Sequence, residues 1–262
     1  MRIQQLLDLT GRVAIVTGGY AGLGRQMAEA FLEAHADVAV CARRVERWSD
    51  SFKQLREAAD REGRRILGAK CDVSVEQEVQ GFLSEVERTL GPVDILVNNA
   101  GITWRAPPEE MRLEDWRRVI DTNLTGAFIC SQIVGRTMIR RRHGSIVNVS
   151  SIFGIRGAAP ETLDTIGYNA SKAAIIGLTR DLAAKWARYS IRVNALAPGW
   201  FETHLTHAVI EKERETILKH IPLGRLGGED DLKGLVVFLA SEASQYITGQ
   251  TIVVDGGLSV QT

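Results

Sequence analysis

The sequence predicts an α/β protein with a doubly wound parallel sheet, arranged as three α/β/α layers. Two observations support this. Short β-branched runs alternate with longer segments of helical periodicity, and a glycine-rich turn directly follows the first run. Repeated strand–helix units imply right-handed crossovers, which place helices on both faces of a parallel sheet. A chain of 262 residues suits one large domain, so we predict a single domain over residues 1–262.

The predicted elements follow one another along the chain. Residues 12–17 form the first strand and residues 18–24 the glycine-rich turn, and a helical pattern then runs through Met27, Phe31 and Leu32. Further strands are predicted at 37–42, near 65–71, near 93–98, at 145–151 and at 250–255. Further helices are predicted near 45–62, near 74–90, over about 112–141, from 168 towards 186, and near 229–241.

Composition excludes several classes of partner. Lys plus Arg and Asp plus Glu both total 32, so no net charge attracts nucleic acid or an acidic membrane. Cys41, Cys71 and Cys130 are far apart and lack CxxC spacing, so we expect no disulfide framework and a reducing compartment. There is no signal-peptide pattern, and no run approaches 18 apolar residues. We therefore expect a soluble, cytoplasmic protein.

The glycine-rich turn points to a dinucleotide. Gly18, Gly22 and Gly24 have GxxxGxG spacing between a strand and a helix. Glycines permit the tight turn, let the backbone approach a pyrophosphate, and expose the N–H groups of the helix N-terminus to its charge. The position of the motif, more than the motif itself, predicts a Rossmann-type fold.

The end of the second strand indicates which dinucleotide is bound. An acid there would bind the ribose hydroxyls and repel a 2′-phosphate, but this chain has Ala42 followed by Arg43 and Arg44. Because arginine offers a planar fork to phosphate, we predict NADP(H) in preference to NAD(H); the alternative is two solvated arginines opening a helix. Asp72, after the third strand, either accepts from an adenine amino group or caps the next helix.

Polar residues gather at the predicted carboxyl edge of the sheet. Asn98, Asn99 and Gly101 follow the fourth strand, where they either floor the cofactor site or form a structural turn. Asn123 lies among apolar neighbours in a predicted helix, so its amide must bond backbone, water or substrate. The strand at 145–151 ends in the hydroxyl of Ser151 at the same edge.

Tyr168 and Lys172 open a predicted helix four residues apart and therefore share one face of it. A tyrosine has a pKa of roughly 10, and a nearby cation favours the phenolate and lowers that pKa. The pair suits a phenol that exchanges protons with a substrate oxygen. YxxxK is short, however, and an incidental pair on an exposed face is the alternative.

With these pieces in order, the chain resembles the short-chain dehydrogenase/reductase family over nearly its whole length. The motifs that carry the resemblance are TGGYAGLG (Thr17–Gly24), NNAG (Asn98–Gly101), Asn123, SSxxG (Ser150–Gly154), YNASK (Tyr168–Lys172), PGxxxT (Pro198–Thr203) and VDGG (Val254–Gly257). Each motif is modest alone, but together and in this order they are highly specific.

The resemblance implies a catalytic tetrad. Tyr168 would be the general acid/base, Ser151 would polarise the substrate oxygen, and Lys172 would lower the Tyr168 pKa and bind the nicotinamide ribose. Asn123 would hold a water that relays protons past Lys172. The cofactor would be bound by Gly18, Tyr20, Gly22, Leu23, Gly24, Arg43, Arg44, Asp72, Val73, Asn99, Ala100, Gly101, Tyr168, Lys172, Pro198, Gly199 and Thr203.

The chain is most similar to the gluconate 5-dehydrogenase-like branch of this family. Residues 152–167, with Pro160, Glu161 and Asp164, form a longer segment than is usual, which either reshapes the substrate pocket or is a tolerated surface insertion. Residues 200–226 form the expected substrate lid. We expect Ser151, Tyr168, Trp104 and His204 to contact the substrate, although a plain surface or core role is as plausible for Trp104.

The branch predicts an NADP(H)-dependent oxidoreductase for a sugar acid, such as gluconate/5-ketogluconate. The alternatives are a 3-oxoacyl-carrier-protein reductase, which shares the tetrad, and a non-catalytic NADP-sensing binding protein, which would not need Tyr168 and Lys172. The family also implies a homotetramer with two-fold symmetry. His204 and His207 have a spacing compatible with a metal, but no further ligand is near in sequence, so no metal is predicted.

Overall fold

The computed structural model describes residues 1–157 and 163–260, and it confirms the predicted class of fold. Seven parallel strands form one sheet in the order β3-β2-β1-β4-β5-β6-β7. The chain begins in the middle of the sheet, builds outward to β3, and returns to place β4 beside β1. This reversal is the doubly wound arrangement. The strands are β1 (Val13–Thr17), β2 (Asp37–Ala42), β3 (Ile66–Lys70), β4 (Ile95–Asn98), β5 (Gly144–Val149), β6 (Ile191–Pro198) and β7 (Thr251–Val254).

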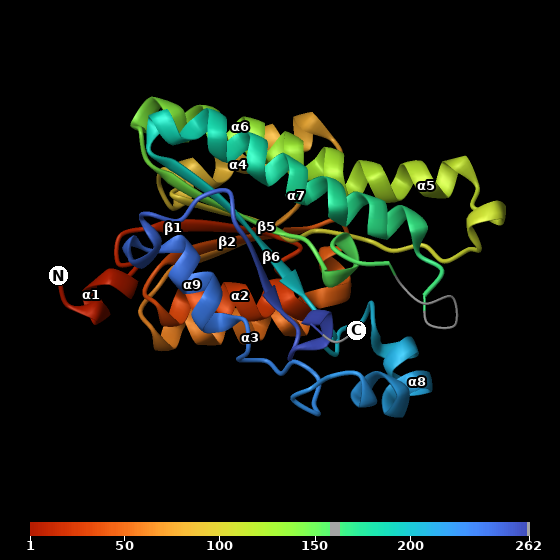
Figure 1. The fold of residues 1–262 in the computed structure, drawn as a ribbon. Coiled ribbons are helices and arrows are strands. Elements are labelled where there is room, and N and C mark those ends of the chain that lie inside the picture. The colour runs from red at the N-terminus through yellow and green to blue at the C-terminus, as the bar shows by residue number, and fades with distance from the viewer. Residues whose placement is uncertain (158–162, 261–262) are drawn as a thin grey trace.

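Helices cover both faces of the sheet (Figure 1). The helices α2 (Gly22–Glu33), α3 (Ser49–Arg61) and α9 (Lys233–Ala240) pack on one face, over a core that includes Met27 and Phe31. On the other face are α4 (Glu76–Thr89), α6 (Gly126–Arg141) and α7 (Ile166–Trp186), with α5 (Leu113–Ile120) extending that layer. The short α1 (Ile3–Leu7) lies near the N-terminus, while α8 (His207–Lys219) lies outside both layers.

The structure departs from the predicted elements in several places, and helices α1 and α8 are among the elements that were not predicted. Strand β6 was not among the predicted strands; its residues Arg192 and Asn194 interrupt the apolar pattern, and both are satisfied by distant backbone carbonyls. The helix predicted over 112–141 is divided by a π-helical turn at Asp121–Thr125. The helix predicted near 45–62 begins with a 3-10 turn over Val45–Trp48. Periodicity does not distinguish these turns from an α-helix.

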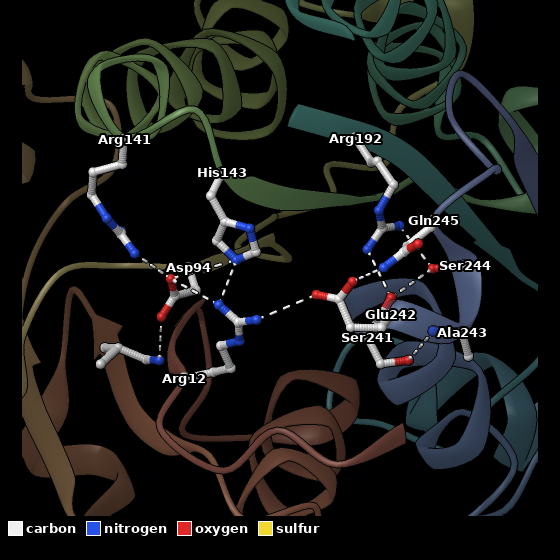
Figure 2. Close-up of polar contacts among 11 residues, drawn as sticks. Arg12, Asp94, Arg141, His143, Arg192, Ser241, Glu242, Ala243, Ser244 and Gln245 are labelled. Carbon is white, nitrogen blue, oxygen red and sulfur yellow. Dashed lines mark hydrogen bonds and ion pairs between the residues drawn. The ribbon is translucent and has the colours of Figure 1, made fainter. Parts of the chain in front are cut away.

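A cluster of charged residues joins the amino ends of the central strands (Figure 2). Asp94 is 4% exposed; it accepts from the Arg141 guanidinium and lies 3.8 Å from that of Arg12. Arg12 also contacts the His143 Nε2 atom at 2.8 Å and Glu242 at 3.3 Å. Burial, followed by the charge of Arg12, lowers the pKa of His143, so its ring stays neutral and accepts the Arg12 N–H. These contacts fix the edge of the sheet opposite the carboxyl ends.

Side-chain amides hold the carboxyl half of the sheet. The Asn98 Nδ2 atom donates to Asn148 Oδ1 at 2.8 Å and to Ser131 at 2.9 Å, and Asn148 donates to Thr179 on α7 at 2.9 Å. This network links β4, β5, α6 and α7, so the Asn98 side chain joins neighbouring elements, a role that neither of its two predicted readings described. In the described ranges no helix is long and apolar enough to cross a membrane.

Candidate active site

The glycine-rich turn lies between β1 and α2, where the strand order reverses. Gly18 and Gly22 have φ angles of +65° and +52°, a region in which side chains with a Cβ are strained. A Cβ on Gly24 would lie 2.3 Å from the Gly18 carbonyl oxygen and 2.4 Å from Asn99 Nδ2. Glycine is therefore required for the shape of the turn, and the backbone is left open towards the pocket.

Asn99 holds this turn against the end of β4. Its Nδ2 atom donates to the carbonyl oxygens of Thr17 at 2.9 Å and Gly18 at 3.3 Å. The Thr17 hydroxyl in turn accepts from the backbone N–H groups of Asn99 and Ala100, at 3.0 and 3.1 Å. These hydrogen bonds hold the ends of β1 and β4 together, and the two strand ends form the floor of the pocket.

Most of the predicted site residues line one pocket along this edge. Four do not line it, namely Gly24, Asp72, Trp104 and Asn123. The lining includes the predicted residues Gly18, Tyr20, Gly22, Leu23, Arg43, Arg44, Val73, Asn99, Ala100, Gly101, Ser151, Tyr168, Lys172, Pro198, Gly199, Thr203 and His204.

Arg43 and Arg44 lie at one end of the pocket, after β2. Arg43 is 3.7 Å from the carboxylate of Asp72, which also accepts from the N–H and hydroxyl of Ser74 at 3.0 and 2.7 Å. Helix α4 begins later, at Glu76, so Asp72 forms a turn before the helix and does not cap it. Its carboxylate supports Arg43 from behind.

Ser151, Tyr168 and Lys172 converge in the middle of the pocket. Helix α7 begins at Ile166, so Tyr168 and Lys172 lie in its first two turns and share one face. The Ser150 hydroxyl donates to the Lys172 carbonyl oxygen at 2.7 Å and ties the end of β5 to α7. A Cβ on Gly154 would lie 2.6 Å from the Lys172 carbonyl carbon, so the close packing here requires glycine.

The ionisation of this pair differs from the sequence-based expectation. Burial raises the pKa of Tyr168, and a hydrogen bond with Ser151 only partly opposes that shift. Burial also lowers the pKa of Lys172 to about 8. Its Nζ atom donates to the Val149 carbonyl oxygen at 2.7 Å and lies 5.5 Å from the centre of the Tyr168 ring. Burial is therefore the largest influence on the pKa of both groups.

Asn123 lies in the π-helical turn and is almost fully buried. Its Oδ1 atom accepts from the Ile102 N–H at 2.8 Å, and its Nδ2 atom donates to the Ile102 carbonyl oxygen at 2.9 Å and to Ser171 at 3.0 Å. Of the partners considered from sequence, backbone is the one observed. A Cβ on Gly101 would lie 3.3 Å from Asn123 Oδ1 and 3.7 Å from Lys172 Nζ, so this glycine separates the two polar groups.

The other wall of the pocket follows β6. Pro198, Gly199 and Thr203 line it, and a Cβ on Gly199 would lie 2.6 Å from the Asp255 Cβ atom. The Asp255 carboxylate accepts from the backbone N–H groups of Gly257 and Ser259 at 2.9 and 2.6 Å. The VDGG segment thus supports the turn after β6 from outside the pocket.

The segment predicted as a lid, residues 200–226, has a small apolar core of its own. Trp200, Val209, Ile210 and Ile217 pack there with Ile152 from the segment after β5. That segment was predicted to be unusually long; Leu163 and Thr165 from it line the pocket, whereas Pro160 and Glu161 lie outside the described residues.

Of two further predicted substrate contacts, His204 lines the pocket and Trp104 does not. Trp104 is 38% exposed, with the Arg118 guanidinium 5.4 Å from its ring, and it does not line the pocket. Its neighbour Arg105 does line it. His204 faces Trp48, whose ring centre is 5.2 Å away, at the same end of the pocket as Arg43. These positions depend on the paths of loops, which periodicity does not reveal.

Arg47 and Trp48 are pocket residues that the sequence analysis did not identify. Both line the pocket, and the Arg47 guanidinium lies 5.2 Å from the centre of the Trp48 ring. The only available signal was a tryptophan shortly after the arginine pair at the end of β2. In the part of the chain that the structure describes, no group of three His, Cys, Asp or Glu side chains is placed to hold a metal.

Comparison with known proteins adds to this geometry. The family model described as Enoyl-(Acyl carrier protein) reductase matches residues 18–259. A 3-oxoacyl-(acyl-carrier-protein) reductase of Thermotoga maritima is 40% identical over 259 residues, covering 97% of this chain and 100% of the relative. Gluconate 5-dehydrogenase of Gluconobacter oxydans is 37% identical over 260 residues, covering 97% of each chain.

Solved structures show the same likeness. A short-chain type dehydrogenase/reductase from Mycobacterium marinum superposes with a TM-score of 0.93 at 36% identity, covering 99% of this chain and 100% of the other. A gluconate 5-dehydrogenase from Burkholderia cenocepacia, in complex with NADP and tartrate, superposes with a TM-score of 0.90 at 37% identity, covering all of both chains.

Proposed function

The chain belongs to the short-chain dehydrogenase/reductase family, and from that premise we propose that it uses NADP(H) to interconvert a secondary alcohol and a ketone of a sugar acid, such as gluconate/5-ketogluconate. It is an NAD(P)-dependent oxidoreductase. The observation that carries the proposal is the convergence of Ser151, Tyr168 and Lys172 in the pocket that the glycine-rich turn opens.

The pocket fits a dinucleotide. Its floor contains backbone that only glycine permits at Gly18 and Gly22, and the N-terminus of α2 is directed towards it. When bound, the cofactor supplies or accepts the hydride. The Ser151 and Tyr168 hydroxyls would hold the substrate oxygen, and Tyr168 would donate a proton to it during reduction or accept one during oxidation.

Lys172 and Asn123 would support this proton transfer from behind. The Lys172 ammonium is anchored by the Val149 carbonyl oxygen, and its charge would favour the Tyr168 phenolate in the transition state. Asn123 fixes the backbone at Ile102 beside Gly101, and we propose that it positions the route of protons past Lys172.

The preference for NADP(H) rests on Arg43 and Arg44, which line the pocket where an acid would select NAD(H). We expect Arg43→Ala to weaken NADPH binding by about tenfold or more and to leave NADH binding unchanged. The loss has two causes: the guanidinium that would pair with the 2′-phosphate is removed, and the Asp72 carboxylate, 3.7 Å from it, loses the positive charge that shields the phosphate from it.

Each protein is titrated into NADPH and, separately, into NADH. The change in nucleotide fluorescence gives the two dissociation constants. Arg61→Ala, an exposed arginine at the end of α3, is the matched control and should change neither. If Arg43→Ala weakened NADPH and NADH binding equally, the arginine would act on the shared part of the cofactor and not on the 2′-phosphate.

The choice of a sugar acid is supported by the relatives and by an arginine in the lining of the pocket. The Burkholderia gluconate 5-dehydrogenase was solved with tartrate, a hydroxy acid, and Arg105 here lines the pocket with a side chain suited to a carboxylate. A 3-oxoacyl-(acyl-carrier-protein) reductase is the competing assignment, because one such relative is 40% identical.

A screen at 340 nm separates the two assignments. NADP⁺ is offered with gluconate, other sugar acids and polyols, and NADPH with acyl thioester and simple ketones. We expect reduction of NADP⁺ with gluconate or a related sugar acid, at a rate well above that with polyols of the same length. Turnover of acyl thioester ketones alone would keep the mechanism and overturn the sugar-acid substrate.

We also propose that residues 200–226 act as the substrate lid of a single-domain subunit. The homotetramer and the cytoplasmic location predicted from sequence complete the proposal, and light scattering on the purified protein would measure the subunit number. The absence of turnover with every alcohol and ketone, together with tight NADPH binding, would instead favour a cofactor-sensing protein.

A further inference from the structure

Trp48 and His204 join two distant parts of the carboxyl edge. Trp48 follows β2 and His204 follows β6, and their ring centres lie 5.2 Å apart with an angle of 56° between the planes. Three strands, β1, β4 and β5, separate β2 from β6 in the sheet. Since neighbouring strands are about 4.8 Å apart, the two strand ends are roughly 19 Å apart, and the segments that follow them approach each other until the two rings meet.

The span passes over the glycine-rich turn. Trp48 and His204 both line the pocket that contains this turn. Next to His204, the Thr203 side chain lies against Gly22, where an added Cβ would be 3.3 Å from Thr203 Cγ2. The segment after β6 therefore crosses the phosphate-binding end of the pocket, and its His204 contacts Trp48 on the far side.

We propose that Trp48 and His204 form an aromatic clasp across the cofactor pocket, which holds a bound dinucleotide and must open before the dinucleotide leaves. The two residues would thus be further cofactor-positioning residues. The inference rests on the binding of a nicotinamide dinucleotide and does not depend on the identity of the alcohol substrate.

The two halves of the clasp differ in how firmly they are held. Trp48 is partly buried against the core beneath α2 and α3, beside Val45 and Phe52. His204 is only partly covered, and it lies on the loop that precedes α8, which has fewer buried contacts. His204 is accordingly the half that moves when the clasp opens.

The chemistry of the contact suits a reversible closure. Burial and the nearby Arg47 charge both lower the pKa of His204, so the imidazole is neutral near pH 7 and packs on the indole as an uncharged ring. A tilted aromatic pair of this kind is held by an interaction that is small enough to break at each turnover.

The test measures how fast the cofactor leaves. Protein loaded with NADPH is mixed in a stopped-flow instrument with excess NADP⁺, and the loss of NADPH fluorescence gives the dissociation rate constant without any substrate. We expect His204→Ala to raise this rate about three- to tenfold, which is the effect of losing one aromatic pair.

His207→Ala is the matched control. His207 lies three residues further along the same segment, does not line the pocket, and is 3.5 Å from Glu202. It removes the same imidazole without touching the clasp, so the NADPH dissociation rate should stay within about twofold of the wild-type value.

A double-mutant cycle with Trp48→Leu, which keeps an apolar side chain against the core, completes the test. If the two rings act on each other, Trp48→Leu/His204→Ala should release NADPH no faster than the faster single variant. Additive effects, or an unchanged rate in His204→Ala, would overturn the clasp. Repeating the displacement with NADH distinguishes failure of the clasp from failure of the NADP(H) assignment. Tighter binding of NADH would refute the preference for NADP(H). The clasp is judged by the dissociation rates of whichever dinucleotide binds.

Discussion

Replacing Tyr168 with Phe should abolish turnover while leaving NADPH binding nearly intact. The substitution removes only the hydroxyl, so the ring still fills its place in α7 beside Lys172. Loss of a general acid/base costs about 10²–10⁴-fold in rate, and loss of a hydroxyl that also orients the substrate oxygen places the effect at the upper end. The ratio kcat/KM should fall by that amount, and the NADPH dissociation constant should change by less than about threefold.

The comparison that matters is between turnover and binding in the same preparation. Tyr246→Phe is the matched control, because this side chain is fully exposed and far from the pocket lining. An equal loss of turnover and NADPH binding in Tyr168→Phe would mean that the tyrosine shapes the cofactor site. Retained turnover would remove it from the mechanism altogether.

Replacing Lys172 with Met should eliminate activity without lowering stability. Burial lowers the pKa of Lys172 from 10.5 to about 8, so at pH 7 the folded protein carries a buried ammonium at a cost of a few kcal/mol. Methionine fills a similar volume without charge, although it leaves the Val149 carbonyl oxygen without its donor, which costs about 1–3 kcal/mol. The melting temperature of the variant at pH 7 should equal or exceed that of the wild type.

The lowered pKa of Lys172 also predicts how the stabilities of the two proteins change with pH. Between about pH 8 and 10.5 the unfolded chain holds a proton on Lys172 that the folded chain has released, so the stability of the wild type gains from this residue as pH rises through that window. The variant lacks this gain, and the difference between the two proteins should shrink or reverse by pH 10. Lys185→Met, an exposed lysine on the same helix, is the control. A melting temperature several degrees lower for Lys172→Met at pH 7 would assign the lysine a mainly structural role.

The sequence predicted the fold class and most strands because those properties depend on local patterns. An apolar β-branched run before a glycine turn identifies β1 and α2 whatever surrounds them, and YNASK identifies the start of α7. Strand β6 was missed because its buried Asn194 is satisfied by the carbonyl oxygen of Ile247, a partner 53 positions away that no local pattern reveals.

The candidate site shows the same division. Residues at strand ends, such as Arg43 and Ser151, were placed in the pocket from their position in the strand–helix alternation. His204 also lines the pocket, but its contact with Trp48 was not predicted, because that contact depends on the path of a long loop relative to a distant strand. The raised pKa of Tyr168 was also not predicted, since it comes from burial, and the depth of burial is a property of the assembled chain.

The π-helical turn at Asp121–Thr125 bears on how the gene for this protein can evolve. Such a turn holds one residue more than the regular helix it interrupts, and it places Asn123 against Ile102. A deletion of one codon here would restore regular α-helical bonding between α5 and α6, so it is a deletion that the fold has reason to tolerate. The deletion would remove the local geometry that places the Asn123 amide against Ile102. Selection for these contacts of Asn123 beside the pocket is then what would keep the extra residue in the reading frame.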